Sequence, residues 1–129
     1  MKILYVENHP VFAAQVCQQF LPTHVVEVLW SLAAARQALA SQAYDLLLVD
    51  YDLDDGKGDE LVRACRVLHP TLRIIAVSAH EAGNAALLKA GASAVCGKME
   101  FDKIQAVIEK LRPKSVEPQV SSNSPPKCR

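Results

Sequence analysis

Short apolar runs alternate along this chain with segments of helical periodicity. Five of these runs predict strands, at residues 3–6, 25–30, 46–49, 74–77 and 94–96. The runs at 46–49 and 74–77 are apolar at every position, a pattern typical of strands that are covered on both faces in a parallel sheet. Glu27 interrupts the second run, so we expect that strand at an edge of the sheet.

Apolar residues three and four positions apart predict a helix after each strand. The predicted helices cover residues 10–21, 32–39, 57–68, 82–90 and 104–111. Pro10 is accepted in a first helical turn, Ser31 is a suitable N-cap and Gly91 a suitable C-cap. The alternation of five strands with five helices therefore predicts an α/β fold with a parallel sheet, right-handed crossovers and helices on both faces.

Polar residues follow four of the predicted strands directly. They are Glu7, Asn8, Asp50, Ser78 and Lys98. Because the carboxyl ends of parallel strands meet at one edge of an open sheet, where such folds bind their ligands, we expect all five side chains to lie there. The strand that ends at Asp50 is apolar at every position, and a turn composition, Asp54-Asp55-Gly56, follows it.

Composition narrows the possible partners. Half of the 129 residues are hydrophobic and the formal net charge is zero, with acidic and basic residues mixed along the chain. A basic face for nucleic acid is therefore not expected. No apolar run reaches membrane-spanning length, and the first ten residues lack a signal-peptide pattern, so we expect a cytoplasmic protein without membrane contact.

The chain is long enough for one domain with a hydrophobic core, which we expect to cover residues 1–112. From Pro113 the composition changes to Pro, Ser, Gln, Lys and Asn without apolar periodicity. Such a segment cannot bury enough surface to offset its ordering entropy. We therefore expect residues 113–129 to form a disordered C-terminal tail.

The residues expected at the sheet edge suit phosphoryl transfer. A carboxylate can attack a phosphoryl group and form an aspartyl phosphate. The incoming group is negatively charged, so the reaction needs a divalent cation such as Mg²⁺, which prefers oxygen ligands. A lysine and a hydroxyl group can hold the remaining phosphoryl oxygens.

The chain resembles the receiver domain of two-component response regulators from Met1 to about Arg112. The matching segments are KILYVENHP, LLLVDYDLDDGKG, IIAVSAH and AGASAVCGKM. The order and spacing of these segments make the resemblance more specific than a single motif. It implies a flavodoxin-like, doubly wound sheet of five parallel strands in the order 2-1-3-4-5.

The resemblance also implies a role for each candidate residue. Asp50 would be the phosphoacceptor, Ser78 the switch hydroxyl and Lys98 the lysine that pairs with the phosphoryl group. Glu7 and Asn8 would stand at the acidic-pair positions of a Mg²⁺ site. The direct metal ligands would be Asp50, Asn8 and the backbone carbonyl of Asp52.

Four positions depart from the usual receiver pattern. Asn8 stands where a second acid is usual, which removes one negative charge beside the metal and predicts weak Mg²⁺ binding. Met99 follows the lysine in place of a proline, so we expect a trans peptide bond and a reshaped loop. Asp54 replaces a proline after the phosphoacceptor, and Val95 replaces the aromatic switch residue. These departures predict reduced activation by phosphorylation.

Three functions are compatible with these residues. The first is a stand-alone receiver that takes a phosphoryl group from a histidine kinase or a histidine phosphotransfer protein and acts through contacts with a downstream protein. It would have no enzymatic activity beyond its own phosphorylation and dephosphorylation. The second is a pseudo-receiver, a binding module with little or no phosphorylation. The third is a phosphatase like the haloacid dehalogenases, because Asp50 and Asp52 form a DxD motif, although those enzymes carry it on their first strand.

Overall fold

The structure is a computed structural model that describes residues 1–112; the predicted tail, residues 113–129, lies outside the described residues. Its elements, in chain order, are β1 (Lys2–Val6), α1 (Pro10–Phe20), β2 (Val25–Leu29), α2 (Leu32–Ser41), β3 (Leu46–Val49), β4 (Asp52–Leu53), β5 (Gly56–Lys57), α3 (Gly58–Leu68), β6 (Arg73–Ala76), α4 (Glu81–Ala90), β7 (Ala94–Val95), the 3-10 helix η1 (Lys98–Lys103) and α5 (Ile104–Lys110). Among the helices of residues 1–112, none is long and apolar enough to cross a bilayer.

The main sheet has five parallel strands in the order β2-β1-β3-β6-β7. This order confirms the predicted 2-1-3-4-5 arrangement, with β3 at the centre and β2 at an edge. The register pairs Val6 with Val49 and Val49 with Ala76. The carboxyl ends of β1, β3 and β6 therefore lie side by side.

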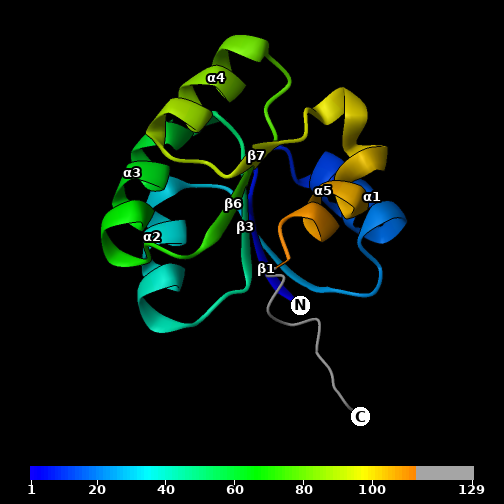
Figure 1. The fold of residues 1–129 in the computed structure, drawn as a ribbon, viewed down its shortest axis with the longest axis horizontal. Coiled ribbons are helices and arrows are strands. Elements are labelled where there is room, and N and C mark those ends of the chain that lie inside the picture. Colours follow the sequence, from blue (N-terminus) through cyan, green and yellow to red (C-terminus); the bar gives the residue numbers. More distant parts are fainter. Residues whose placement is uncertain (113–129) are drawn as a thin grey trace.

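Helices cover both faces of the sheet, as predicted. Figure 1 shows α2, α3 and α4 on one side and α1 and α5 on the other. The central strand serves both layers, because alternate side chains point to opposite faces. Leu47 and Val49 pack in the cluster beneath α2, α3 and α4, whereas Leu46 and Leu48 pack beneath α1 and α5. All four are 0–1% exposed, which explains why the run is apolar at every position.

The turn after Asp50 lies where it was predicted, but it belongs to a small antiparallel hairpin of β4 and β5 that was not predicted. Leu53 is buried in this hairpin. Asp55 at its tip accepts hydrogen bonds from Leu32 N at 2.7 Å and Ala33 N at 3.1 Å. The hairpin therefore satisfies two amide groups at the start of α2 that have no partner within the helix.

The segment after β7 also differs from the prediction. The chain enters η1 before α5, and Phe101 in η1 is buried against the rings of Tyr5, Phe12 and Phe20, at centroid distances of 5.9, 6.3 and 6.1 Å. The peptide between Lys98 and Met99 is trans, and the described residues contain no cis peptide bond. Lys98 is thereby fixed at the first position of a short helix packed on the core.

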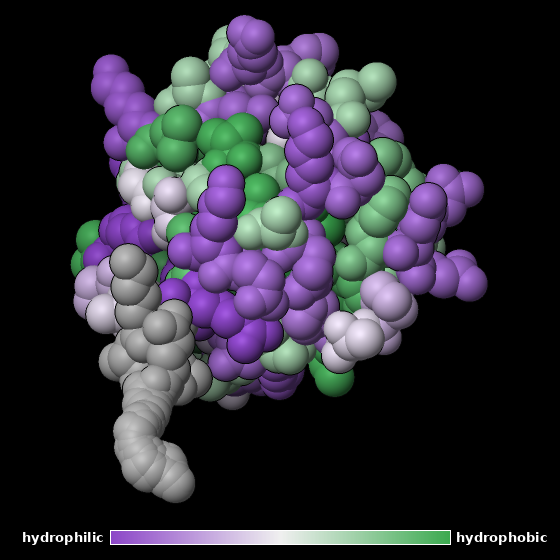
Figure 2. Space-filling model, turned by 45° about the vertical axis from the view of Figure 1, so that its right-hand side comes forward, coloured by the Kyte–Doolittle hydropathy of each residue, from purple (hydrophilic) through white to green (hydrophobic). Residues whose placement is uncertain are grey.

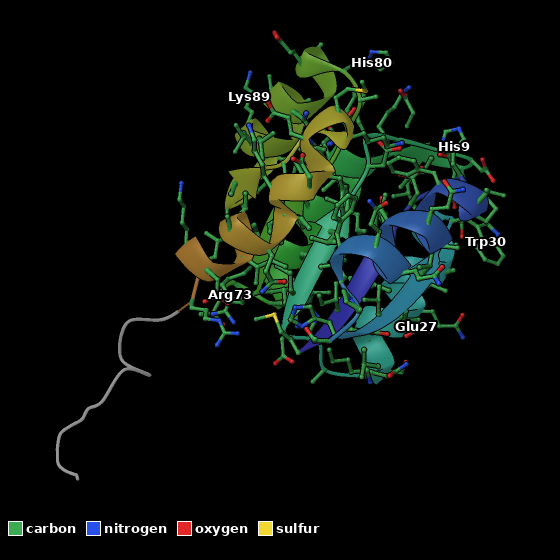
Figure 3. The ribbon with its side chains drawn as sticks, turned by 90° about the vertical axis from the view of Figure 1, so that its right-hand side faces the viewer. His9, Glu27, Trp30, Arg73, His80 and Lys89 are labelled. Carbon is green, nitrogen blue, oxygen red and sulfur yellow. The ribbon has the colours of Figure 1, made fainter. Side chains whose placement is uncertain are left out.

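One face of the molecule is largely hydrophilic. Figure 2 shows hydrophilic side chains spread over the visible face, with apolar groups between them. Figure 3 places His9 and His80 toward one edge of the molecule and Arg73 toward the opposite edge, in agreement with their positions at the two ends of the strands.

Candidate functional site

The carboxyl ends of the strands bring together most of the residues that the sequence singled out. Glu7 follows β1, Asp50 follows β3, and Lys98 opens η1 just after β7. Backbone hydrogen bonds join these ends, from Asp50 N to Val6 O at 3.0 Å and from Lys98 N to Ser78 O at 3.3 Å. Glu7, Asp50 and Ser78 are 0%, 4% and 2% exposed, so this edge holds ionisable side chains away from water.

The Lys98 ammonium lies between the two carboxylates. Lys98 Nζ is 2.9 Å from Asp50 Oδ2, 2.9 Å from Glu7 Oε1 and 3.0 Å from Glu7 Oε2. Its position is also compatible with a cation–π contact, since it lies 5.3 Å from the centroid of the Phe12 ring. One ammonium group therefore lies within hydrogen-bond distance of two buried acidic side chains.

This arrangement changes the proton affinities of the central pair. Burial raises the pKa of Asp50, Glu7 adds to the rise, and the hydrogen bond from Lys98 opposes it. Burial lowers the pKa of Lys98, but the hydrogen bonds to Asp50 and Glu7 outweigh burial, and its pKa is raised. Asp50 Oδ1 also accepts a hydrogen bond from Tyr51 N at 2.7 Å. Lys98 is therefore held as a cation against the oxygens that would react.

Glu7 is held by its own neighbours. Its Oε2 accepts a hydrogen bond from His9 N at 3.1 Å and lies 2.9 Å from His9 Nδ1, while Tyr5 OH donates to Oε1 at 3.4 Å. Ligand atoms of Glu7, His9 and Asp50 lie within 4.8 Å of one another. His9 was not among the residues predicted from the sequence, although its place in the polar run Glu7-Asn8-His9 after a strand could have indicated it.

Asn8 has an unused acceptor. Its Oδ1 is buried and has no hydrogen-bond partner within residues 1–112, while its Nδ2 donates to Asp54 Oδ1 at 3.4 Å. The amide oxygen of Asn8, which follows Glu7 directly in the chain, and the clustered carboxylates of Glu7 and Asp50 are oxygen donors, which is the chemistry that Mg²⁺ prefers. The residues present therefore fit a divalent cation, with Asp50, Glu7 and Asn8 as the groups that could hold it.

The structure places the side chain of Asp52 apart from this cluster. Its carboxylate is 54% exposed and pairs with Lys57 across the β4–β5 hairpin, and this pairing lowers the pKa of Asp52. The acids that gather at the sheet edge are Glu7 and Asp50. The phosphatase interpretation requires both carboxylates of a DxD motif to lie together at one centre. The side chains of Asp50 and Asp52 do not meet this requirement.

Two glycines allow the backbone to close around the site. A Cβ atom on Gly58 would lie 2.0 Å from Asp50 O, and Gly58 N donates to Tyr51 O at 2.6 Å. A Cβ atom on Gly83 would lie 2.7 Å from Ser78 Oγ. The first turns of α3 and α4 can therefore approach Asp50 and Ser78 only because these positions lack side chains. Neither glycine was among the site residues predicted from the sequence.

Ser78 is buried and held through several groups. Its Oγ accepts a hydrogen bond from His80 N at 3.2 Å, and the side chain of Asn84 hydrogen-bonds its backbone. Asn84 was also missed, because a polar residue within a helical pattern is usually solvent-exposed. Its spacing of three positions before Leu87, a buried residue of α4, is the signal that could have placed it on the inner face.

The site thus combines a buried carboxylate, an adjacent ammonium group, a buried hydroxyl and a set of oxygen donors. Such a set can form and stabilise an acyl phosphate on the carboxylate, because the charges of the phosphoryl oxygens would be matched by the lysine and a metal ion.

Comparison with known proteins identifies the family of this chain. The sequence model of the response regulator receiver domain matches residues 3–110. Among curated proteins, no match was found.

Solved structures share the fold. The response regulator TrrA of Thermotoga maritima, in complex with Mg²⁺ and BeF, has a TM-score of 0.78 at 20% identity, over 86% of this chain and 98% of that one. The CheY-like receiver domain protein of Methanospirillum hungatei has a TM-score of 0.74 at 24% identity, over 85% and 92%. The receiver domain of NtrX from Brucella abortus has a TM-score of 0.75 at 21% identity, over 84% and 96%.

At these identities the structures establish the fold, and the family is established by the sequence match, which spans most of the chain. The strand order and the helices on both faces agree with both findings. This chain belongs to the response regulator receiver domain family.

Proposed function

We propose that this receiver domain accepts a phosphoryl group on Asp50 and transmits the change through contacts with another protein. The observation that carries the proposal is the position of Lys98, whose ammonium lies 2.9 Å from Asp50 Oδ2 in a site where Asp50 is 4% exposed. A buried carboxylate with a single cation at hydrogen-bond distance is a nucleophile with charge compensation already in place.

In the proposed reaction, an Asp50 carboxylate oxygen attacks the phosphorus atom of a phosphohistidine. The new P–O bond forms as the P–N bond breaks, and the imidazole leaves with the bonding electron pair. Lys98 would stay with the phosphoryl oxygens as they take its place beside Asp50, and Ser78 would donate its hydroxyl hydrogen to one of them. Hydrolysis by water would later release phosphate and restore the carboxylate. The donor is a histidine kinase or a histidine phosphotransfer protein.

The proposed cofactor is Mg²⁺. Asp50, Asn8 and the backbone carbonyl of Asp52 would hold it, with Glu7 beside them. When bound, the ion supplies positive charge that offsets the incoming phosphoryl group. The buried, unpartnered Oδ1 of Asn8 supports this assignment, because it is an oxygen donor without another partner in the described part of the chain. The Thermotoga maritima structure shows that a protein of this fold has been solved with Mg²⁺ and BeF.

One observation favours a second candidate, the pseudo-receiver. Asn8 is neutral, so the cation would meet one carboxylate fewer than with an acid at this position. In that case the domain would bind its partner without being phosphorylated.

Intact-mass measurement after incubation with acetyl phosphate and Mg²⁺ separates the two. We expect the mass of one added phosphoryl group in the wild type. The group should not be added when EDTA is present before the phosphodonor, and it should not be added to Asp50→Asn. A wild-type chain that stays unmodified at saturating Mg²⁺ would establish the pseudo-receiver instead. Asp45→Asn is the matched control, because it removes an exposed carboxylate from the other end of the same strand.

A further inference from the structure

His9 is a side chain beside the proposed site that the phosphoryl chemistry does not use. It lies between β1 and α1, after the polar residues Glu7 and Asn8. Its side chain is 66% exposed, and its Nδ1 atom lies 2.9 Å from Glu7 Oε2. Ligand atoms of Glu7, His9 and Asp50 lie within 4.8 Å of one another. An imidazole nitrogen therefore joins two buried carboxylates at the edge of the sheet.

The spacing of these three atoms is close to that of ligands on one metal ion. Zn²⁺ binds imidazole nitrogen and carboxylate oxygen at about 2.0–2.2 Å, so two ligands of one ion lie about 3.0–3.4 Å apart. His9 Nδ1 and Glu7 Oε2 are already at 2.9 Å. Closure by at most about 1.4 Å would bring Asp50 into the same range. The exposed ring of His9 can make this adjustment, whereas Lys98 holds both carboxylates in place.

The carboxylates keep electron pairs for a metal ion while Lys98 stays bound. Lys98 Nζ contacts Asp50 Oδ2, whereas the partner of Asp50 Oδ1 within residues 1–112 is Tyr51 N, at 2.7 Å. Glu7 Oε2 accepts a hydrogen bond from His9 N at 3.1 Å, so it keeps a donor when the imidazole turns to a metal. An ionised carboxylate has about four lone-pair sites, more than these contacts use. The neutral ring of His9 can carry its proton on Nε2, which leaves Nδ1 free to bind a metal.

The imidazole determines which ions the set favours. Mg²⁺ prefers oxygen ligands, so His9 adds nothing to its binding. Imidazole suits Zn²⁺ and related transition metals, and three protein ligands with one open position is a common Zn²⁺ arrangement. The buried Oδ1 of Asn8, which has no hydrogen-bond partner in the described part of the chain, is a further oxygen donor for either ion. The set with His9 therefore differs from the all-oxygen set proposed for Mg²⁺.

We propose that Glu7, His9 and Asp50 form a site for Zn²⁺ or a related transition metal, and that this ion and Mg²⁺ exclude one another. Exclusion follows because both ions would use Asp50 and lie beside Glu7, and two divalent cations on the same carboxylates repel each other. The site does not require that Asp50 is phosphorylated. It would make the occupancy of Asp50 depend on which metal is present, and His9 would be the residue that distinguishes the metals.

The first test is NMR of the 15N-labelled chain, titrated with Zn²⁺ or with Mg²⁺. In the wild type we expect Zn²⁺ to shift the ring resonance of His9 Nδ1, and Mg²⁺ to leave it in place. The backbone amides of Asp50 and Tyr51 give the dissociation constant at this site, separately from other histidines and cysteines that bind Zn²⁺. In His9→Ala we expect Zn²⁺ to bind at least about tenfold more weakly and Mg²⁺ to bind as before, since even residues around a metal's ligands alter affinity by that factor.

His80→Ala is the matched control. His9 and His80 lie toward the same edge of the molecule (Figure 3), both are exposed, and each precedes a helix without capping it through its side chain. Within residues 1–112, His9 is the histidine whose ring pairs with a carboxylate. His80→Ala should therefore keep the wild-type affinity for both ions. Because neither ring makes a capping hydrogen bond, both variants should fold.

Four results would overturn the inference. They are an unshifted His9 Nδ1 in saturating Zn²⁺, an unchanged Zn²⁺ affinity in His9→Ala, an equal loss for Zn²⁺ and Mg²⁺ in that variant, and a Mg²⁺ affinity that Zn²⁺ does not reduce in the wild type. The third would show that His9 only orients Glu7. A chain that binds Zn²⁺ as expected but takes no phosphoryl group from acetyl phosphate and Mg²⁺ would overturn the proposed function and leave this site standing.

Discussion

The central strand β3 carries an aspartate at each end, and the two ends differ in almost every respect. Asp45, before the strand, is exposed and accepts a hydrogen bond from Lys2 N at 2.7 Å. Asp50, after the strand, is 4% exposed and pairs with Lys98. Only the second is desolvated beside a cation. The two aspartates therefore differ in burial and in neighbours, although both lie next to the same apolar strand.

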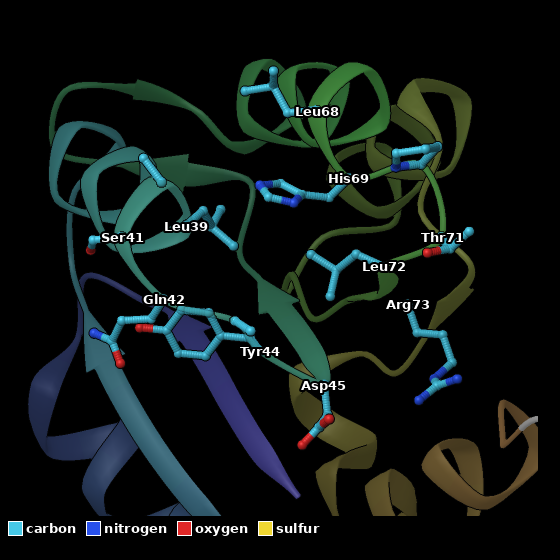
Figure 4. A pocket seen from close by; sticks show the side chains of 13 residues that line it. Leu39, Ser41, Gln42, Tyr44, Asp45, Leu68, His69, Thr71, Leu72 and Arg73 are labelled. Carbon is cyan, nitrogen blue, oxygen red and sulfur yellow. The ribbon is translucent and has the colours of Figure 1, made fainter.

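The surroundings of the two ends differ as well. Near Asp45, the connections that precede β3 and β6 border an open hollow of about 720 Å³, lined by thirteen residues that include Tyr44, His69 and Arg73 (Figure 4). Near Asp50 the side chains contact one another directly. Lys98 Nζ lies 2.9 Å from Asp50 Oδ2 and 3.0 Å from Glu7 Oε2. One end of the sheet is therefore open and weakly paired, and the other is closed and charged.

The largest effect is expected from removing the negative charge at one end of β3 or at the other. Asp50→Asn removes the proposed nucleophile and should abolish phosphorylation by acetyl phosphate, whereas Asp45→Asn should leave it unchanged. Intact-mass measurement checks both. Labelling that persists in Asp50→Asn would show that another acid is modified and would remove the distinction between the two ends.

The next effect concerns the buried cation. Lys98→Met leaves Glu7 and Asp50 without their shared partner, and we expect it to lower the free energy of unfolding by about 3 kcal/mol at pH 7, at the low end of the range for broken buried pairs because Lys98 is 13% exposed. Urea denaturation with EDTA present measures it. Lys57→Met is the control, since its ion pair with Asp52 is half exposed and contributes little. Equal losses in both variants would contradict the distinction.

The loss from Lys98→Met should also depend on pH. The folded pKa of Lys98 is raised above its ordinary value of 10.5, so the stabilisation is complete below pH 10.5 and is lost as the pH rises through the folded pKa. The pKa of Asp50 is raised above its ordinary value of 3.8, so the ionised Asp50 carboxylate lowers the stability of the folded state. This cost is relieved as the pH falls through the folded pKa of Asp50 toward 3.8. The difference between wild type and variant should therefore decrease at both extremes. A difference that stays constant from acid to alkaline pH would refute the pairing.

A smaller effect is expected from restoring a charge beside the metal. Asn8→Asp should tighten Mg²⁺ binding about tenfold, the scale on which changes around a metal's ligands alter affinity. Tryptophan or tyrosine fluorescence titration measures the dissociation constant. Gln42→Glu adds the same charge at the opposite edge, where Gln42 accepts a hydrogen bond from Lys2, and should have no effect. Unchanged or weaker binding in Asn8→Asp would mean that Glu7 already supplies the charge.

The smallest effect is expected on the face formed by β7 and α5. Mg²⁺ and beryllofluoride should change the amide shifts of Val95, Ile104 and Ile108 only weakly, because the χ1 rotation of Val95 is restricted and Ile104 and Ile108 are 0–1% exposed in the core. Residues around the hollow, such as Leu72, should not shift. Large shifts throughout α5, or dimerisation through it on phosphorylation, would contradict this expectation.

The sequence was sufficient to predict the fold because each long element carries its own periodicity. The four-residue apolar run before Asp50 and the i, i+3, i+4 spacing of the last helix are visible without tertiary information. It was also sufficient to predict that Glu7, Asp50 and Lys98 meet, since topology alone brings strand ends together. The roles of these residues in phosphorylation stay predictions.

Other features depend on contacts that have no periodic signal. The strands β4 and β5 have two residues each, too few to show alternation, and Asp55 joins them to α2 through side-chain contacts between distant segments. Phe101 is buried in a 3-10 helix at Lys98–Lys103, where the sequence predicted no helix; the predicted helix begins at residue 104. Asn84 was missed because hydrophobic patterns identify buried residues by their apolar character, and this buried residue is polar.

The edges of the sheet have a consequence for the behaviour of the chain at high concentration. An unpaired edge strand can hydrogen-bond to the same strand of another molecule and begin aggregation. β7 offers only two residues for such pairing, and β2 carries Glu27 at its centre, held by a hydrogen bond from Tyr44 OH. Two β2 strands paired antiparallel about their centres would place one Glu27 opposite the other, and like charges in that position are destabilising. The carboxylate that marks β2 as an edge strand in the sequence thus also opposes the joining of sheets between molecules.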